Sequence, residues 1–116
     1  MARSKEQVKD EMLQGTLDML ILRALITGPA HGYTIARIIE QTSDEVLQVE
    51  QGSLYPALHR LEDRGWLGSY WGSSENNRKA KFYKLTQAGK KQLVVETSRW
   101  RRMVEAITRV MGEVED

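Results

Sequence analysis

The stretch GSLYPALHRLEDRGWLGSYWG, Gly52 to Gly72, decides the fold of this chain. In its first half, Leu54, Leu58 and Leu61 recur at the i, i+4, i+7 spacing of one helix face, while polar residues occupy other positions around the cylinder. This helix is expected to start at or very near Gly52. One of its faces should therefore pack against a core, and the other can contact a ligand.

A β-hairpin is expected directly after this helix. Gly65 suits the left-handed residue that ends many helices. The runs Leu67 to Gly72 and Ala80 to Leu85 are rich in aromatic and apolar residues, and the two tryptophans of the region are expected in the hairpin core. The six polar residues 73–78 are too many for a two-residue turn, so we interpret them as a flexible wing tip. A helix followed by such a hairpin predicts a winged helix-turn-helix, a mainly α fold with a small β-hairpin wing.

Length and composition exclude several classes of protein. With 116 residues, the chain can form one domain of modest core with an appendage, and its 41% hydrophobic and 28% charged residues are typical of soluble globular proteins. The absence of cysteine excludes disulfides, a thiol nucleophile and a cysteine metal site, and we expect neither metal nor cofactor. No signal core and no apolar run near ~20 residues is present, so we expect a cytoplasmic protein without membrane contact.

The charge is small in total but unevenly distributed. The net charge is only +1, yet Arg78 to Lys91 holds six basic residues and no acidic one, whereas Glu40 to Glu50 holds four acidic residues and no basic one. This distribution places positive charge on the predicted wing, as nucleic-acid binding requires. The alternative is a solvated basic face without a ligand.

Three further helices are predicted. The first opens near Ser4, becomes apolar nearly all round from Leu17, which marks it as the central core helix, and stops at Gly28. The second runs from residue 31 or 32 to residue 41 and packs its isoleucines inward. The last is capped by Thr86 and continues to about Gly112.

The last helix carries a seam of its own. Its apolar side chains step alternately by four and three residues, which is the a/d pattern of a coiled coil. The seam consists of Leu93, Thr97, Trp100, Val104, Ile107, Met111 and Val114. Because a stripe on the order of 30 Å long needs a partner helix, we predict an antiparallel or crossed homodimer through residues 87–116, with residues 1–86 as the winged domain. The alternative is that the stripe folds back on its own domain.

Three segments give the chain a family resemblance. They are LDMLILRALITGPAHGYTIARII (Leu17 to Ile39), GSLYPALHRLEDRGWL (Gly52 to Leu67) and KFYKLTQAG (Lys81 to Gly89). In this order they resemble the PadR family of transcriptional regulators. The resemblance implies a dimeric winged helix-turn-helix protein that binds double-stranded DNA, with an added C-terminal dimerisation helix. Many members are repressors that small hydrophobic compounds, such as phenolic acids, release from DNA.

The chain departs from the family at the wing. Members often carry GRPRKYYRLT there, whereas this chain has Asn77, Lys79 and Ala80 in place of the glycine, the proline and the second arginine. The wing keeps its positive charge, but its tip geometry differs from the family's pattern.

The expected DNA contacts follow from the way a winged helix docks. The third helix enters the major groove with its N-terminal residues nearest the bases, the second helix contacts the backbone, and the wing adds phosphate or minor-groove contacts. The predicted contacts are Gln51, Ser53, Tyr55, Pro56, His59 and Arg60 on the third helix, Tyr33, Thr34 and Arg37 on the second, and Arg78, Lys79 and Lys81 on the wing. A dimer should read an inverted repeat with half-sites ~34 Å apart. Two contacts have alternatives: Tyr55 can instead be partly buried against the wing, and His59 can be an ordinary surface residue.

Trp100 is a candidate effector site. It lies midway along the seam, where two copies could leave an apolar gap that stacks a flat aromatic ligand; simple interface packing is the alternative. The sequence contains no phosphate-binding loop, HExxH motif or thiol, and no catalytic serine, histidine and aspartate set that the predicted fold would bring together, so we do not expect an enzyme. A dimeric winged-helix module for protein contact remains the rival class.

Overall fold

The computed structural model describes residues 16–113 of the chain. Its elements are α2 (Leu17–Ala24), β1 (Ala30–His31), α3 (Gly32–Thr42), α4 (Gln51–Asp63), β2 (Leu67–Ser73), β3 (Lys79–Leu85) and α5 (Gln87–Met111). This order confirms the mainly α fold with a β-hairpin wing. Helix α4 begins one residue before the predicted start. The expected helix opening near Ser4 and the seam position Val114 lie outside the described residues.

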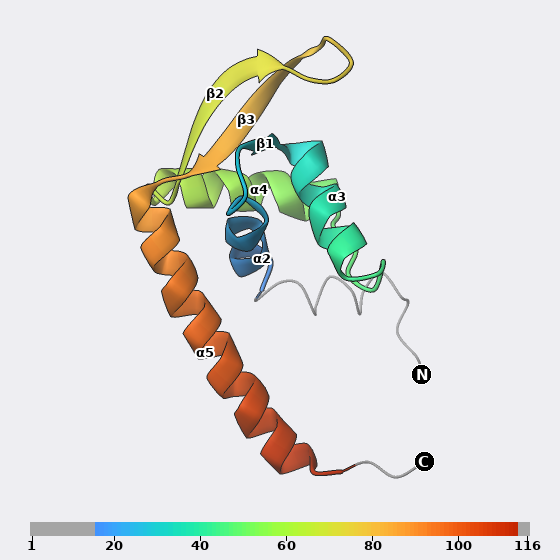
Figure 1. Ribbon diagram of the computed structural model, residues 1–116, viewed down its shortest axis with the longest axis vertical. Helices are drawn as coiled ribbons and strands as arrows, with labels where there is room; N and C mark the ends of the chain where they lie inside the picture. The colour runs from blue at the N-terminus through green and yellow to red at the C-terminus, as the bar shows by residue number, and fades with distance from the viewer. Residues whose placement is uncertain (1–15, 114–116) are drawn as a thin grey trace.

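Helix α2 lies at the centre of the fold, as its all-round apolar sequence predicts (Figure 1). Leu17, Ile21 and Leu22 are buried in it, and it contacts α3, α4 and α5. Helix α4 contributes Leu58 and Leu61 to the same core, together with the rest of its predicted apolar face. Within residues 16–113, no helix is both long and apolar enough to cross a bilayer.

A local hydrogen-bonding motif ends α4 and directs the chain into the hairpin. Gly65 has φ +78°, the left-handed conformation predicted for it. Its N–H donates to the Glu62 carbonyl, and the N–H of Trp66 donates to the Leu61 carbonyl, which is the Schellman arrangement. The turn fixes the point at which β2 leaves the helix.

The sheet has one strand that the sequence did not predict. The strand order is β1-β3-β2, with both pairs antiparallel. Strand β1 has only two residues, Ala30 and His31, which pair with Tyr83 and Phe82. A two-residue strand is too short to show alternation, so the sequence carries no signal for it. The His31 ring packs edge-on against Phe82 at 5.3 Å, which attaches the start of α3 to the wing.

The wing tip is a hydrogen-bonded turn. The Ser74 N–H donates to the Arg78 carbonyl, and the Asn77 N–H donates to the Ser74 carbonyl. Asn77 has φ +58°, a left-handed conformation that asparagine tolerates better than most residues other than glycine. This explains how Asn77 can stand where family members have glycine. The expectation that Trp71 lies in the hairpin core is wrong: its side chain is 63% exposed, because the hairpin projects beyond the core at that point.

Helix α5 begins as predicted and then leaves the core (Figure 1). The Thr86 hydroxyl accepts from the Gly89 N–H at 3.0 Å and donates to the Gly65 carbonyl at 2.6 Å. Leu93 is buried in the core, whereas every residue from Ser98 to Glu113 is exposed. At 25 residues the helix is about 37 Å long. Most of its length therefore extends past the domain that anchors it.

Candidate nucleic-acid interface

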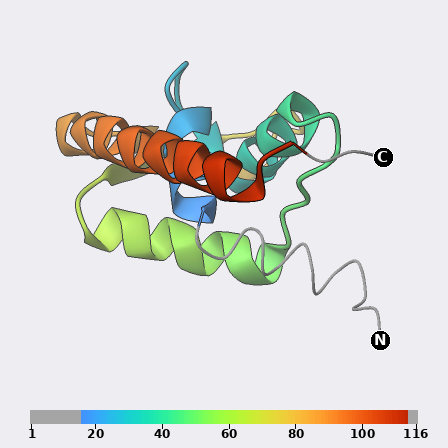
Figure 2. The same cartoon turned by 90° about the horizontal axis from the view of Figure 1, so that it is seen from below.

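Within residues 16–113, no element covers the outward face of α4. Figure 2 shows α4 and α5 on opposite sides of α2, so the long helix does not lie over the α4 surface. Gln51, Ser53, Pro56 and His59, which the sequence predicted as contacts, are all exposed there. Pro56, which has no N–H to donate to the helix, is exposed to solvent. This face presents the hydrogen-bonding side chains of Gln51, Ser53 and His59 along α4.

The start of α3 adjoins this face. The Tyr55 ring packs over Gly32, where a Cβ atom would lie 2.9 Å from the phenol oxygen. Tyr55 therefore packs against the start of α3, and it remains 41% exposed. The neighbouring Tyr33 is 67% exposed, and the Thr34 hydroxyl lies 3.3 Å from the Nε2 atom of His31. Tyr55 and the start of α3 thus form one continuous surface.

Two of the predicted contact arginines are held by carboxylates. Arg37 lies 2.8 Å from Glu40 and 3.2 Å from Glu45, and its pKa is raised by these hydrogen bonds. Arg60 lies 2.8 Å from Asp18 on α2. Both cations are directed to partners in their own chain, so less of their charge is available to an external phosphate.

Lys81 is similarly engaged at the base of the wing. Its Nζ atom lies 3.2 Å from Glu62 Oε1, while the other oxygen of Glu62 accepts a hydrogen bond from the Ser69 hydroxyl. The Ser69 hydroxyl and then Lys81 lower the pKa of Glu62, and the Glu62 carboxylate raises the pKa of Lys81. The sequence does not reveal the contact between Glu62 and Lys81, because residues 19 positions apart show no periodic relationship.

The outer wing presents a different set of side chains. Arg78 and Lys79 are exposed, and the Lys79 ammonium lies over the Trp71 ring at 5.1 Å. Trp71 pairs with Lys81 in the sheet register, so these side chains share one hairpin face. On the other face, Lys84 lies 5.9 Å from the Tyr70 ring. Strand alternation could have identified Trp71 as a neighbour of these cations, but the sequence could not show where the core ends.

The predicted seam is divided between two environments. Leu93 is buried in its own domain, and the Thr97 hydroxyl donates to the Leu93 carbonyl at 2.7 Å. Further along the helix the seam side chains are exposed. These are Trp100, Val104, Ile107 and Met111. The exposed part of the predicted seam therefore begins after Thr97.

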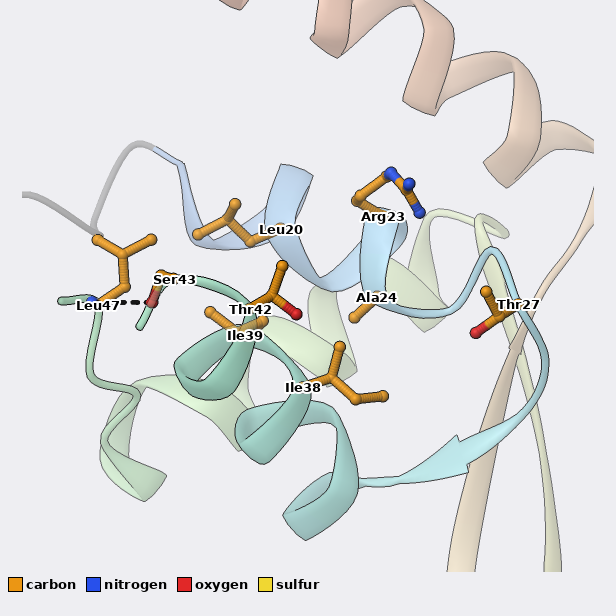
Figure 3. A pocket seen from close by; sticks show the side chains of 9 residues that line it. All are labelled: Leu20, Arg23, Ala24, Thr27, Ile38, Ile39, Thr42, Ser43 and Leu47. Carbon is orange, nitrogen blue, oxygen red and sulfur yellow. Dashed lines mark hydrogen bonds between the residues drawn. The ribbon is translucent and has the colours of Figure 1, made fainter. Parts of the chain in front are cut away.

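In the described part of the chain, α2 borders two cavities, one toward α5 and one toward α3. The larger, about 520 Å³, lies between α2 and α5 and is lined by Trp100, Arg101 and Arg23, among others. The smaller, about 350 Å³, lies between α2 and α3 (Figure 3). In Figure 3, Ile38 and Thr42 point from α3 toward α2, while the Arg23 side chain extends toward α5. Leu20, Arg23 and Leu47 line both cavities, so the two are adjacent.

Comparisons with known proteins agree with this architecture. The model of the transcriptional regulator PadR-like family matches residues 21–95. An uncharacterised protein of Lysinibacillus sphaericus is 29% identical over 108 residues, which are 93% of this chain and 99% of that protein.

Solved structures show the same fold. A transcriptional regulator from Clostridium thermocellum superposes with a TM-score of 0.78 at 30% identity, covering 85% of this chain and 96% of its own. A PadR family transcription regulator from Clostridium difficile superposes with a TM-score of 0.72 at 29% identity, covering 84% and 100%. Both are described as regulators, and the chain is a regulator rather than an enzyme. The family model spans well over half of the sequence, and the chain belongs to the PadR-like family of transcriptional regulators.

Proposed function

We propose that this chain is a cytoplasmic, homodimeric repressor that binds an inverted-repeat operator and is released from it by a small aromatic effector. The observation that carries the proposal is the uncovered face of α4, with Gln51, Ser53 and His59 exposed on the side of α2 away from α5. A helix with polar side chains near its N-terminus fits the major groove, where glutamine pairs with adenine and serine with several bases. Tyr55 on the same helix and Tyr33 at the start of α3 reach the DNA backbone.

The wing supplies contacts that depend little on base sequence. Arg78 and Lys79 are exposed and carry positive charge that phosphates attract. The indole of Trp71, exposed beside Lys79, packs on the sugar-phosphate chain and adds an N–H donor. Arg37, Arg60 and Lys81 contribute less than the sequence suggested, because each is already paired with a carboxylate.

A second copy completes the DNA reader. The exposed apolar side chains of α5 continue the coiled-coil spacing from Thr97 to Met111, and the burial of such a seam needs another helix. A two-fold dimer presents two α4 helices to one face of the duplex, so that the half-sites lie ~34 Å apart.

The cavity between α2 and α5 is the proposed effector site. It joins the flat ring of Trp100 to two arginines, Arg23 and Arg101. An indole stacks on aromatic rings, and guanidinium groups bind carboxylates, so an aromatic acid matches both features. Occupation of this cavity shifts α5 relative to α2 and thereby changes the spacing of the two α4 helices.

The proposal is tested by DNA binding at several salt concentrations. Labelled fragments from upstream of the protein's own gene are titrated by fluorescence anisotropy, and footprinting locates the site. We expect specific binding to an inverted repeat that weakens steeply as salt rises. Equal and weak affinity for every duplex would contradict an operator.

One observation favours a second function. The surface around α4 also exposes Tyr33, Tyr55 and Trp71, while three of its cations are paired with carboxylates. Aromatic side chains with little net charge are typical of protein interfaces. A dimeric winged-helix module that contacts proteins would show negligible affinity for DNA even at low salt, which separates it from the regulator.

A further inference from the structure

Glu62 connects the helix α4 to both strands of the wing. One carboxylate oxygen accepts a hydrogen bond from Ser69 on β2, and the other lies 3.2 Å from the Lys81 ammonium on β3. Ser69 pairs with Tyr83 and Lys81 with Trp71, so the two partners are diagonal neighbours on one hairpin face. A single side chain therefore holds adjacent strands against the helix.

The position of this contact allows it to control the angle of the wing. Toward the base, Tyr83 is buried and fixes the hairpin to the core, whereas Trp71 and residues 75–79 of the outer wing are exposed. From Ser69 the strand continues to the tip at Ser74, roughly 17 Å at ~3.3 Å per residue. A tilt of only about 10° at Ser69 would displace that tip by roughly 3 Å, enough to break a phosphate hydrogen bond. The contact thus lies where the wing angle is determined.

The helix itself gives no reason for a carboxylate at this position. Glu62 is in the last turn of α4, and its own carbonyl accepts from the Gly65 N–H. Negative charge near a helix C-terminus is unfavourable, because the carbonyl end of the helix dipole is also negative. Ser69 and Lys81 offset that cost, which indicates that the side chain serves the wing rather than the helix.

We infer that Glu62 is a positioning residue that fixes the angle of the wing to α4 and so pre-organises the protein for DNA. This inference rests on the proposed DNA binding. It also assigns Lys81 to the interior contact instead of to a phosphate. Pre-organisation raises affinity because less conformational freedom is lost when the complex forms.

The decisive comparison is between two adjacent carboxylates on α4. Glu62→Gln and Asp63→Asn remove the same charge at neighbouring positions, and Asp63 is exposed. If both were merely negative charges near DNA, both changes would strengthen binding. We expect Asp63→Asn to strengthen binding or leave it unchanged, and Glu62→Gln to weaken binding to every duplex by about two- to tenfold.

Ser69 separates position from charge. Ser69→Ala keeps every charge but removes one link, and we expect it to weaken binding, with recovery in Ser69→Thr, which restores the hydroxyl. In the free protein, amide hydrogen exchange in β2 and β3 should be faster in Glu62→Gln and Ser69→Ala than in Asp63→Asn. This readout needs no DNA, so it tests the contact even if the proposed function fails. If Glu62→Gln binds as tightly as Asp63→Asn and exchanges at the same rate, the inference is overturned; Ser69→Ala decides the matter if Glu62→Gln does not fold.

Discussion

The carbonyl oxygen of Trp66 occupies the space that a Cβ atom on Gly89 would need. Gly89 is in the first turn of α5, and Trp66 follows the turn that ends α4, so this contact joins the base of the wing to the long helix. Thr86 caps the helix, and the glycine lets its first turn pass against a backbone carbonyl that cannot move aside.

Gly89→Ala should destabilise the protein by about 2–3 kcal/mol, because the added methyl group overpacks against main chain. Gly52→Ala is the matched control: it also lies in a helix, but no atom lies within 4 Å of its added Cβ, and it should stabilise α4 by up to ~1 kcal/mol. Urea denaturation measures both. Equal effects of the two substitutions would contradict the packing assigned to Gly89.

The contact of Glu62 with the wing should contribute to the loss of folding stability at acidic pH. Its pKa is lowered in the folded protein, chiefly by Ser69 and then by Lys81. The contact therefore contributes stability above the unfolded pKa of about 4.3, and this stability is lost as pH falls through the folded value. Ser69→Ala and Lys81→Met should each reduce the loss of stability between neutral pH and acid, because each removes a group that lowers the pKa of Glu62. Urea unfolding at several pH values measures this loss, and an unchanged loss in both variants would contradict the contact.

Lys79 and Lys81 should differ in their effect on salt dependence. Lys79 lies on the exposed wing, so Lys79→Met should reduce the slope of log affinity against log salt by about 1. Lys81 is paired with Glu62, so Lys81→Met should weaken binding with little change in slope. Anisotropy titrations over a range of salt concentrations distinguish the two. Equal slope changes in the two variants would indicate that Lys81, like Lys79, contacts a phosphate.

The seam of α5 should determine the oligomeric state. Ile107→Asp places a charge in the predicted interface, where its burial is unfavourable, and should give a monomer. Ala106→Asp introduces the same side chain one position away, off the seam, and should leave the dimer intact. Light scattering coupled to gel filtration gives the mass of each variant. A monomeric parent protein, or dissociation by both substitutions, would contradict the seam.

Trp100 should report on effector binding. In a Trp66→Phe, Trp71→Phe protein it is the remaining tryptophan of the three, and aromatic acids should quench its fluorescence. Arg23→Met should weaken binding of the acid by about tenfold and leave the corresponding neutral amide unchanged, because only the acid has a carboxylate for the guanidinium. If no compound of a broad aromatic panel changes the fluorescence, the result would contradict the proposed effector site.

The sequence by itself determined the local elements. The spacing of Leu54, Leu58 and Leu61 specified the buried face of α4, Gly65 its end, and Thr86 the start of α5, because periodicity, backbone conformation and capping act within a few residues. The predicted contact residues on α4 could be named as exposed for the same reason.

Only the tertiary structure decided which charges are already paired and where the core ends. Arg60 meets Asp18 from 42 residues away, Lys81 meets Glu62, and Trp71 projects beyond the core instead of filling it. Strand β1 exists only because two residues happen to lie beside β3. Such relationships depend on how the helices and the hairpin are placed in space, and no local pattern in the chain encodes them.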